Sequence, residues 1–239
     1  MSFQALNGVL SKAKREVEGK TLEGLPMPRA ILFANGDLPD PNLARQLIQP
    51  GDILIAADGG ARHAASLGVV PSLIIGDFDS LSAAELERFA SAGATLERHP
   101  PAKDETDLEL ALDHAIRAGY SPILVLGAYG GRLDQSLGIF SLLSAPECVT
   151  ANARADDGAT EAFFISTQAE IDGTAGDTVS LIAWGQPAEA VTTDGLEYPL
   201  KAETLSQFRT RGISNRMNAA KAKVSLLSGL LLCIHTRQK

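Results

Sequence analysis

The sequence contains little cysteine, and none in a spacing typical of a metal or redox motif. Cys148 and Cys233 are the only two cysteines among 239 residues, and each lies in or beside apolar sequence without a Cys-x-x-Cys pattern. We therefore expect two buried thiols of a cytosolic protein, although a disulfide between them stays open. The histidines also lack ligand spacing, which favours structural or surface roles for all four: His63, His99, His114 and His235.

Long apolar runs and basic stretches are missing as well. No run approaches the roughly 20 apolar residues of a membrane span, and the N-terminus has no apolar segment of signal-peptide length. The net charge is −8, and the Lys and Arg residues form only short clusters, which argues against non-specific nucleic-acid binding. We expect a cytoplasmic protein with no membrane and no nucleic-acid partner.

Strand and helix patterns alternate through the first part of the chain. Short apolar runs ending in glycine or acidic turns are followed by helical periodicity, which predicts an α/β domain with a parallel sheet over residues 29–147. Residues 1–28 precede this pattern and are interpreted as an N-terminal extension. Ser82 and Glu85 match a capping box at the start of one predicted helix, and helical periodicity resumes at Asp104.

The pattern changes after Pro146. Short β-rich runs separated by turns predict a separate all-β domain over residues 148–239. Hairpin-like signals occur at Asp157-Gly158 and Asp194-Gly195, and the last two strands are expected to turn at Ser228-Gly229. Trp184 is interpreted as a packing residue.

Aspartates follow two neighbouring predicted strands within residues 53–80. Asp58 ends the first strand, and Asp77 and Asp79 follow the second, so a parallel arrangement brings all three carboxylates to one edge of the sheet. Asp104 and Asp107 open the helix after a later strand and join the same edge. Carboxylates this close repel one another unless a cation lies among them, and Mg²⁺ prefers such oxygen ligands.

Simpler interpretations exist for each part of this acidic cluster. Asp77-Phe78-Asp79 is also typical of a solvated turn, and Asp104 with Asp107 of a helix N-cap and its reciprocal partner. Capping does not require acids from three separate segments to converge on one edge. The convergence favours a cation site.

Two further segments could contact ligands. Residues 127–132 form a glycine-rich turn between a predicted strand and helix, where backbone N–H groups and Arg132 suit a phosphate. The turn has neither the Lys-Ser/Thr of a Walker loop nor a Gly-x-Gly-x-x-Gly spacing, and a plain connector is the alternative. Residues 211–215, including Ser214 and Asn215, could hydrogen-bond a heterocycle or form an ordinary turn.

Six motifs in order carry a family resemblance. They are AADGG at 56–60, IIGDFDS at 74–80, KDETDLELAL at 103–112, GAYGGRLDQ at 127–135, VTTDGLEYPL at 191–200 and GISN at 212–215. In this order and spacing, residues 30–236 resemble thiamin pyrophosphokinases, also called thiamin diphosphokinases. The series is much more specific than any one motif.

The resemblance implies an α/β domain followed by a β-sandwich, and a homodimer whose active sites lie between the α/β domain of one subunit and the sandwich of the other. It implies Mg²⁺ ligands at Asp58, Asp77, Asp79 and Asp107, and catalytic roles for Asp77, Asp79, Asp107 and Arg132. It also implies thiamin contacts at Ser214 and Asn215. The nucleotide side is expected at Asn35, Asp58, Gly59, Lys103, Asp104, Thr106, Gly130, Arg132, Asp134 and Gln135.

The implied reaction is attack of the thiamin hydroxyl on the β-phosphorus of ATP, which yields thiamin diphosphate and AMP. Such a site needs cations, in-line positioning and a carboxylate that accepts the hydroxyl proton; Asp107 and Asp79 are the candidates for this base. One alternative is a metal-dependent phosphohydrolase that activates water at the same acidic edge. Another is a non-catalytic sensor of nucleotide or thiamin.

Overall fold

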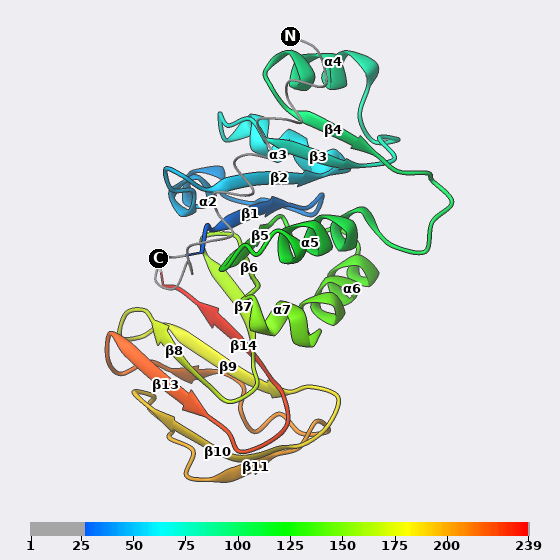
Figure 1. Cartoon of the computed structure of the whole chain (residues 1–239). Helices are drawn as coiled ribbons and strands as arrows, with labels where there is room; N and C mark the ends of the chain where they lie inside the picture. Colours follow the sequence, from blue (N-terminus) through cyan, green and yellow to red (C-terminus); the bar gives the residue numbers. More distant parts are fainter. Residues whose placement is uncertain (1–26, 239) are drawn as a thin grey trace, which may run out of the picture.

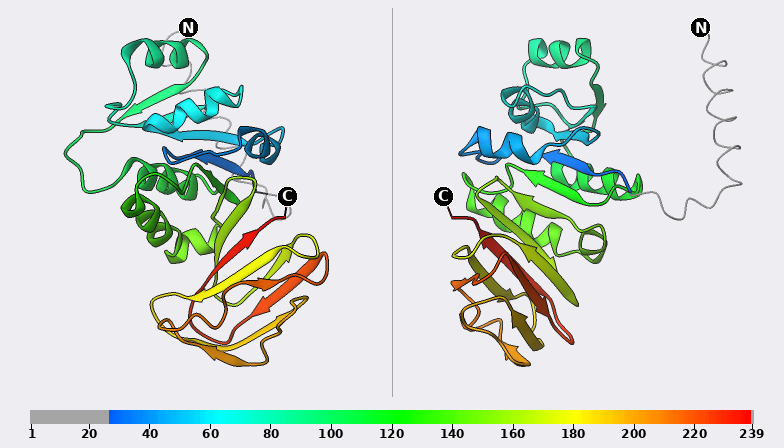
Figure 2. Two further views of the ribbon diagram at one scale, coloured as in Figure 1. Left: turned by 180° about the vertical axis from the view of Figure 1, so that it is seen from behind. Right: turned by 90° about the vertical axis from the view of Figure 1, so that its left-hand side faces the viewer.

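The computed structural model describes residues 27–238, so all but the last two residues of the predicted N-terminal extension lie outside the described range. The described chain forms a ten-stranded sheet and a four-stranded sheet. Helices flank one half of the large sheet, and the small sheet packs against its other half (Figures 1 and 2). The predicted α/β fold followed by an all-β sandwich is confirmed.

The first half of the large sheet is parallel. Its strands are short and mostly apolar, as expected for strands covered on both faces. In spatial order they are β5 (Ile123–Leu126), β1 (Ala30–Phe33), β2 (Ile53–Ala57), β3 (Leu73–Gly76) and β4 (Thr95–Arg98). The chain runs outward from β1 to β4 and then returns to the other side of β1, so its direction across the sheet reverses between β1 and β5.

Helices cover both faces of these strands. Alternate residues of β1 point to opposite sides: Ile31 and Phe33 pack in one core cluster, and Ala30 and Leu32 in another. The first cluster lies under α2 (Pro41–Leu47), α3 (Ala61–Ser66) and α4 (Ala83–Ser91). The second lies under α5 (Asp107–Arg117), α6 (Leu133–Leu143) and α7 (Pro146–Thr150).

The helix starts test the sequence predictions directly. The capping box of α4 is confirmed, with the Ser82 hydroxyl accepting from Glu85 N–H and the Glu85 carboxylate accepting from Ser82 N–H. Helix α5 begins at Asp107 and not at Asp104, because the Thr106 hydroxyl caps it by accepting from Glu109 N–H. The interpretation of Asp104 as the N-cap is therefore wrong. Helix α7 was not predicted, since it is too short for a clear periodicity.

Strand β6 (Arg154–Asp156) joins the two halves of the large sheet. It pairs in parallel with β5 and antiparallel with β7 (Thr160–Ile165), so the sheet continues without a break. The continuation adds β14 (Leu231–Thr236), β9 (Thr178–Ala183) and β12 (Asn215–Arg216). The domain boundary at residue 147 stays a prediction, because one sheet runs through both halves.

The second sheet completes the sandwich. Its order is β11 (Glu203–Leu205), β10 (Ala188–Asp194), β13 (Lys221–Ser225) and β8 (Gln168–Asp172). An apolar core fills the space between the sheets, with Leu181 and Leu231 from the large sheet and Val191 and Val224 from the small one. Inward residues alternate with exposed ones along β13, which is the pattern of a half-buried strand.

The turn predictions in this half had mixed outcomes. Asp157-Gly158 does lie in the turn between the antiparallel strands β6 and β7. The segment at Ser228-Gly229 is not a hairpin: β13 pairs with β10 and β8, whereas β14 pairs with β7 and β9, so the chain crosses between sheets there. Turn composition alone does not distinguish these two connections.

The remaining packing predictions hold. Trp184 packs edge-on against Phe164, with ring centroids 5.4 Å apart. Cys148 and Cys233 are buried and not disulfide-bonded. Within residues 27–238, no helix has the length and apolar character needed to cross a bilayer.

Candidate functional site

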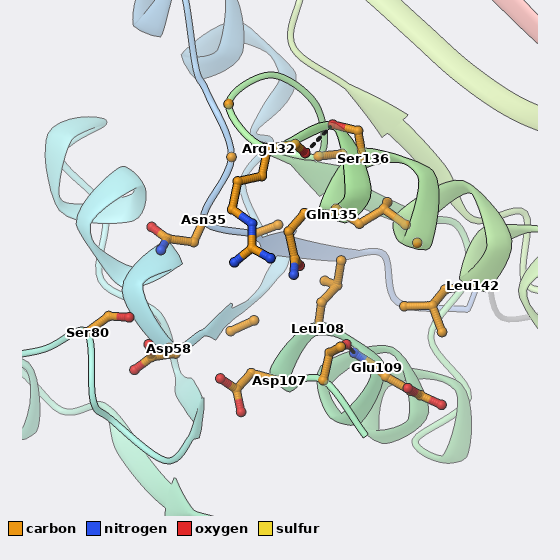
Figure 3. Close-up of a pocket in the computed structure, with 18 of the residues that line it drawn as sticks. Asn35, Asp58, Ser80, Asp107, Leu108, Glu109, Arg132, Gln135, Ser136 and Leu142 are labelled. Carbon is orange, nitrogen blue, oxygen red and sulfur yellow. Dashed lines mark hydrogen bonds between the residues drawn. The ribbon is translucent and has the colours of Figure 1, made fainter. Parts of the chain in front are cut away.

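A cleft of about 830 Å³ opens at the carboxyl ends of the parallel strands. Its walls come from the segments after β1, β2, β3 and β5, together with the start of α5 and one face of α6 (Figure 3). In open α/β sheets, ligands bind where the strand order reverses, and here that place is between β1 and β5. The fold therefore puts the cleft where the topology favours a binding site.

Three carboxylates meet on one side of this cleft. One oxygen each of Asp58, Asp77 and Asp107 lies within 4.8 Å of the others. Gly76 makes this approach possible, because a Cβ there would lie 2.9 Å from Asp58 Cβ and 3.2 Å from Asp107 Cγ. The convergence expected from the parallel strands is thus observed for one aspartate after β2, one after β3 and one at the start of α5.

Two oxygens of this carboxylate group lack hydrogen bonds. Asp58 Oδ1 and Asp107 Oδ1 are buried, and neither has a hydrogen-bond partner among residues 27–238. Lys103 Nζ lies 2.8 Å from Asp107 Oδ1 as an ion pair, although the contact does not have the geometry of a hydrogen bond. Buried carboxylate oxygens without hydrogen bonds are costly unless positive charge lies close to them, so these two oxygens are suited to bind a cation.

Burial and the close approach of three carboxylates shift the pKa values of both Lys103 and Asp107. Burial raises the pKa of Asp107, and the contact with Lys103 offsets this only in part. Desolvation lowers the pKa of Lys103, but the contact with Asp107 and the charges of Asp77 and Asp58 outweigh it, so the net shift is upward. Lys103 is therefore a firmly protonated cation beside three carboxylates.

Asp79 also lines the cleft but stands apart from the three. Its backbone N–H donates to Asp77 Oδ1 at 3.1 Å, and its own Oδ1 accepts from the Ser80 hydroxyl at 3.1 Å. Between the two aspartates, Phe78 is buried and has a φ of 66°. A bulky residue rarely adopts this left-handed conformation, which costs about 1–3 kcal/mol and persists only where neighbouring groups impose it.

The glycine-rich turn forms the opposite wall. Gly131 N–H donates to Asp37 Oδ2 at 2.9 Å, and Gly36 N–H donates to the Gly127 carbonyl at 2.8 Å. The turn after β5 is therefore tied to the turn after β1. A side chain at position 130 would collide with Asp37, since its Cβ would lie 2.6 Å from Asp37 Cβ.

Arg132 and Gln135 enter the cleft from the α6 side. Figure 3 shows both side chains directed toward the space bounded by Asp58 and Asp107. The Arg132 guanidinium makes a bidentate contact with Asp134, with distances of 3.1 Å from Nε to Oδ1 and 2.6 Å from Nη2 to Oδ2. Because this ion pair is exposed, exchanging it for another anion costs little.

Most of the predicted site residues line the cleft, and four do not. Gly59 is buried next to Asn35, and a Cβ at position 59 would lie 2.8 Å from the Asn35 amide. Asp104 is exposed to solvent, and Ser214 and Asn215 belong to the sandwich. Asn215 is engaged with its own fold, accepting from Tyr198 N–H and donating to the Tyr198 carbonyl. Those in the lining are Asn35, Asp58, Asp77, Asp79, Lys103, Thr106, Asp107, Gly130, Arg132, Asp134 and Gln135.

Five polar residues of the lining were not predicted from the sequence: Asp37, Ser80, Glu105, Glu109 and Ser136. Asp37 follows the first strand in an Asn-Gly-Asp turn, and that position after a parallel strand was a usable signal. Ser80 follows Asp79 and carried no comparable signal. Both lie on segments whose neighbours were already candidates.

Two family models match successive parts of the chain. The thiamin pyrophosphokinase catalytic domain matches residues 44–154, and the thiamin pyrophosphokinase vitamin B1 binding domain matches residues 165–231. The chain belongs to the thiamin pyrophosphokinase family. The catalytic model contains the three converging carboxylates and Arg132, and the vitamin B1 binding model contains Ser214 and Asn215.

Relatives of this family align over most of the chain. A thiamine pyrophosphokinase of Bacillus subtilis (strain 168) is 29% identical over 184 residues, covering 76% of this chain and 86% of the relative. Thiamine pyrophosphokinase 1 of Oryza sativa subsp. japonica is 25% identical over 235 residues, covering 87% of each. The crystal structure of a Bacillus subtilis thiamine pyrophosphokinase superposes with a TM-score of 0.79 at 25% identity, covering 88% of this chain and all of that one.

Proposed function

We propose that this protein is an ATP-dependent pyrophosphotransferase that converts thiamin and ATP to thiamin diphosphate and AMP. The observation that carries the proposal is the group of Asp58, Asp77 and Asp107 facing Arg132 across a cleft, in a chain that matches both domains of the family in order. Transfer of a pyrophosphoryl group needs positive charge around the phosphates and a positioned acceptor.

Mg²⁺ fits the carboxylate side of the cleft. The donor set is made of hard oxygens, and Asp58 Oδ1 and Asp107 Oδ1 are buried without a hydrogen-bond partner in the described chain. Asp58, Asp77 and Asp107 would hold the ion, with Asp79 next to them on the rim. When bound, Mg²⁺ supplies charge neutralisation at the phosphate oxygens.

The polypeptide supplies the other requirements. Arg132 can exchange its exposed contact with Asp134 for a phosphate oxygen, and Gln135 and Asn35 offer neutral donors beside it. Lys103 adds a second fixed positive charge within the acidic side. A carboxylate, with Asp107 and Asp79 as candidates, accepts the proton of the thiamin hydroxyl as the oxygen attacks the β-phosphorus and AMP leaves.

The thiamin contacts are proposed to come from a second copy of the chain. Among the described residues 27–238, those that line the cleft all lie between positions 34 and 142, so Ser214 and Asn215 do not reach the cleft of their own chain. In a homodimer, the loop that leads into β12, with Ser214 at its end and Asn215 at the start of the strand, would cover the cleft of the partner subunit. Support comes from exposed apolar side chains near this loop, including Tyr198, Phe208 and Ile213.

The activity test uses ATP, Mg²⁺ and thiamin with separation of the products. We expect AMP and thiamin diphosphate in equal amounts, with no AMP when thiamin is omitted. Release of inorganic phosphate without thiamin would indicate a phosphohydrolase instead. Tight binding of both substrates without product would indicate a sensor.

Asp77→Asn tests whether the group of Asp58, Asp77 and Asp107 is needed for activity. It keeps the size of the side chain and removes one of the three converging charges, so activity should fall at least about 100-fold while the far-ultraviolet circular dichroism spectrum is unchanged. Wild-type turnover of this variant at low Mg²⁺ would show that the metal assignment is wrong.

The shared site is tested by mixing two inactive variants. Asp77→Asn damages the α/β side, and Asn215→Ala damages the proposed thiamin side. If each site uses both subunits, random exchange makes about half of the dimers mixed, each with one intact site, so activity recovers to about a quarter of wild type. No recovery after verified subunit exchange, or a monomer in light scattering, would contradict the shared site.

A further inference from the structure

The turn over residues 77–80 places two carboxylates of the cleft through an unusual backbone. Asp77 and Asp79 line the cleft, and Phe78 between them is 6% exposed with a φ of 66°. Within the turn, Asp79 N–H donates to Asp77 Oδ1 and the Ser80 hydroxyl donates to Asp79 Oδ1, and both hydrogen bonds help to maintain this shape. A left-handed phenylalanine persists only where neighbouring groups impose it.

Arg98 contacts this turn from outside the cleft. Its Nη1 donates to the Asp77 carbonyl at 2.7 Å, and its guanidinium carbon lies 4.7 Å from the centroid of the Phe78 ring. One side chain thus binds the backbone of the aspartate and covers the face of the buried phenylalanine, which is a cation–π contact. Arg98 is exposed and does not line the cleft, so it does not itself touch a ligand there.

The position of Arg98 follows from the edge strand. Arg98 is the last residue of β4 and pairs in register with Gly76, the residue just before Asp77. His99 N–H then donates to the Gly76 carbonyl at 2.8 Å, which extends the ladder to the start of the turn. The parallel pairing of β4 with β3 therefore places the Arg98 guanidinium next to Asp77, the first residue of the turn.

A second arginine holds the other end. Arg62 Nη2 donates to the Ser80 carbonyl at 2.6 Å, and the same guanidinium binds Glu85 of α4. Arg62 thus fixes the exit of the turn to the capped start of α4, whereas Arg98 fixes its entry. Loss of Arg98 would remove the contact with the Asp77 carbonyl at the start of the turn, whereas the contact of Arg62 with the Ser80 carbonyl at its end would remain.

We propose that Arg98 is a positioning residue that fixes Asp77 and Phe78 so that the Asp77 carboxylate is presented to a divalent cation together with Asp58 and Asp107. The inference deepens the proposed function, since it rests on those three carboxylates binding a cation. Groups that orient the ligands of a metal are worth about 10- to 100-fold in metal affinity. The exposed position of Arg98 makes this effect separable from folding.

The test measures binding of Mn²⁺ alone to the full chain, by the electron paramagnetic resonance signal of the free ion, without nucleotide. We expect Arg98→Ala to raise the dissociation constant at least about 10-fold. Arg98→Lys keeps a cation and a donor and should recover part of the loss. The matched control is Arg88→Ala, because Arg88 lies 5.3 Å over the Phe89 ring on α4 but does not line the cleft.

The outcomes separate this inference from the proposed function. Failure of the wild-type chain to bind Mn²⁺, with Asp77→Asn indistinguishable from it, would overturn the cation site itself. Binding by wild type with an unchanged constant for Arg98→Ala would overturn only the role of Arg98. Equal weakening by Arg88→Ala and Arg98→Ala would also overturn it, because loss of stability would then be the cause. Melting temperatures in EDTA establish whether each variant is folded.

Discussion

At the scale of single residues, Lys103 is the group that lets three carboxylates share one wall of the cleft. Its ammonium lies 2.8 Å from Asp107 Oδ1, and both side chains are largely shielded from water. Charges in such a place are tolerated only when a partner is present, and removal of one partner leaves the other uncompensated. In the protein without a divalent ion, Lys103 is that partner.

We therefore predict that Lys103→Gln lowers the free energy of unfolding by about 1 kcal/mol in EDTA. Saturating Mg²⁺ should narrow the difference, because it restores a cation among Asp58, Asp77 and Asp107. Urea unfolding with and without Mg²⁺ measures both values. Lys221→Gln is the control, since Lys221 pairs with Glu170 and Asp172 on an exposed face and should change stability by less than about 0.5 kcal/mol. A loss for Lys103→Gln that is the same in both conditions would contradict the explanation.

Residues also show how far the sequence could predict the site. Asp58 and Asp77 were predictable because parallel strands bring their carboxyl ends to one edge, and Asp107 because it belongs to the acidic start of a helix that follows a later strand. The contact of Lys103 with Asp107 was not predictable from helical spacing, since Lys103 lies in the loop before α5. The contacts of Arg98 with Asp77 and of Gly131 with Asp37 join segments 21 and 94 residues apart. Such contacts depend on register and side-chain direction, which periodicity does not specify.

At the scale of elements, a buried polar network ties the strands of the sandwich to the junction with the α/β half. His235 of β14 is fully buried, with Nδ1 2.9 Å from Glu161 of β7 and Nε2 3.0 Å from Asp177 just before β9. Both ring nitrogens face carboxylates, so both donate only when the ring is protonated. The carboxylate of Glu161 also contacts Arg154 of β6 at 3.0 Å and Arg237 at 3.7 Å.

This network predicts a fall in stability at alkaline pH. Burial lowers the pKa of His235, but hydrogen bonds to Glu161 and Asp177 outweigh it, so the net shift is upward from the ordinary 6.5. The stabilisation is therefore complete below pH 6.5 and is lost as pH rises through the folded-state pKa. His235→Gln should cost about 3 kcal/mol at pH 6 and clearly less above the folded-state pKa.

Urea unfolding from pH 6 to pH 9 tests this expectation. The control is His99→Gln, because the His99 side chain pairs with Glu97 in a partly exposed contact on the surface. A cost for His235→Gln that does not change with pH would mean that the ring is neutral in the folded protein. The sequence did not predict the network, since three of its members come from strands that are joined only by the tertiary fold.

At the scale of the whole molecule, one sheet runs from the parallel half into the sandwich through β5, β6 and β7. The two halves share backbone hydrogen bonds there, and the second core cluster under α5, α6 and α7 includes Phe164 of β7 and Leu232 of β14. Fold class and the change near residue 147 were predictable from periodicity. The shared sheet was not, because β6 is only three residues long and carries no pattern.

We predict that the two halves unfold together. Trp184, the only tryptophan, directly follows β9 of the sandwich and packs on Phe164 in the core cluster under α5, α6 and α7, so its fluorescence reports on the junction of the two halves. Circular dichroism reports mainly on the helices, which in the described chain all lie between residues 41 and 150. Tryptophan fluorescence and far-ultraviolet circular dichroism should therefore give the same midpoint in urea. Two separate midpoints would show that the halves are independent units, as multi-domain chains often are.

Strand β14 is synthesised after the two strands that it joins, β7 and β9, so their pairing is completed late in synthesis. It follows every other strand of both sheets in the chain, yet it lies between β7 and β9 in the finished sheet. While a ribosome is still making residues 231–236, the edges of β7 and β9 have no partner, although all strands of the parallel half have already emerged. The nascent sandwich therefore exposes two unpaired edges until β14 has been made, and this is the period in which a chaperone or a second chain can bind it.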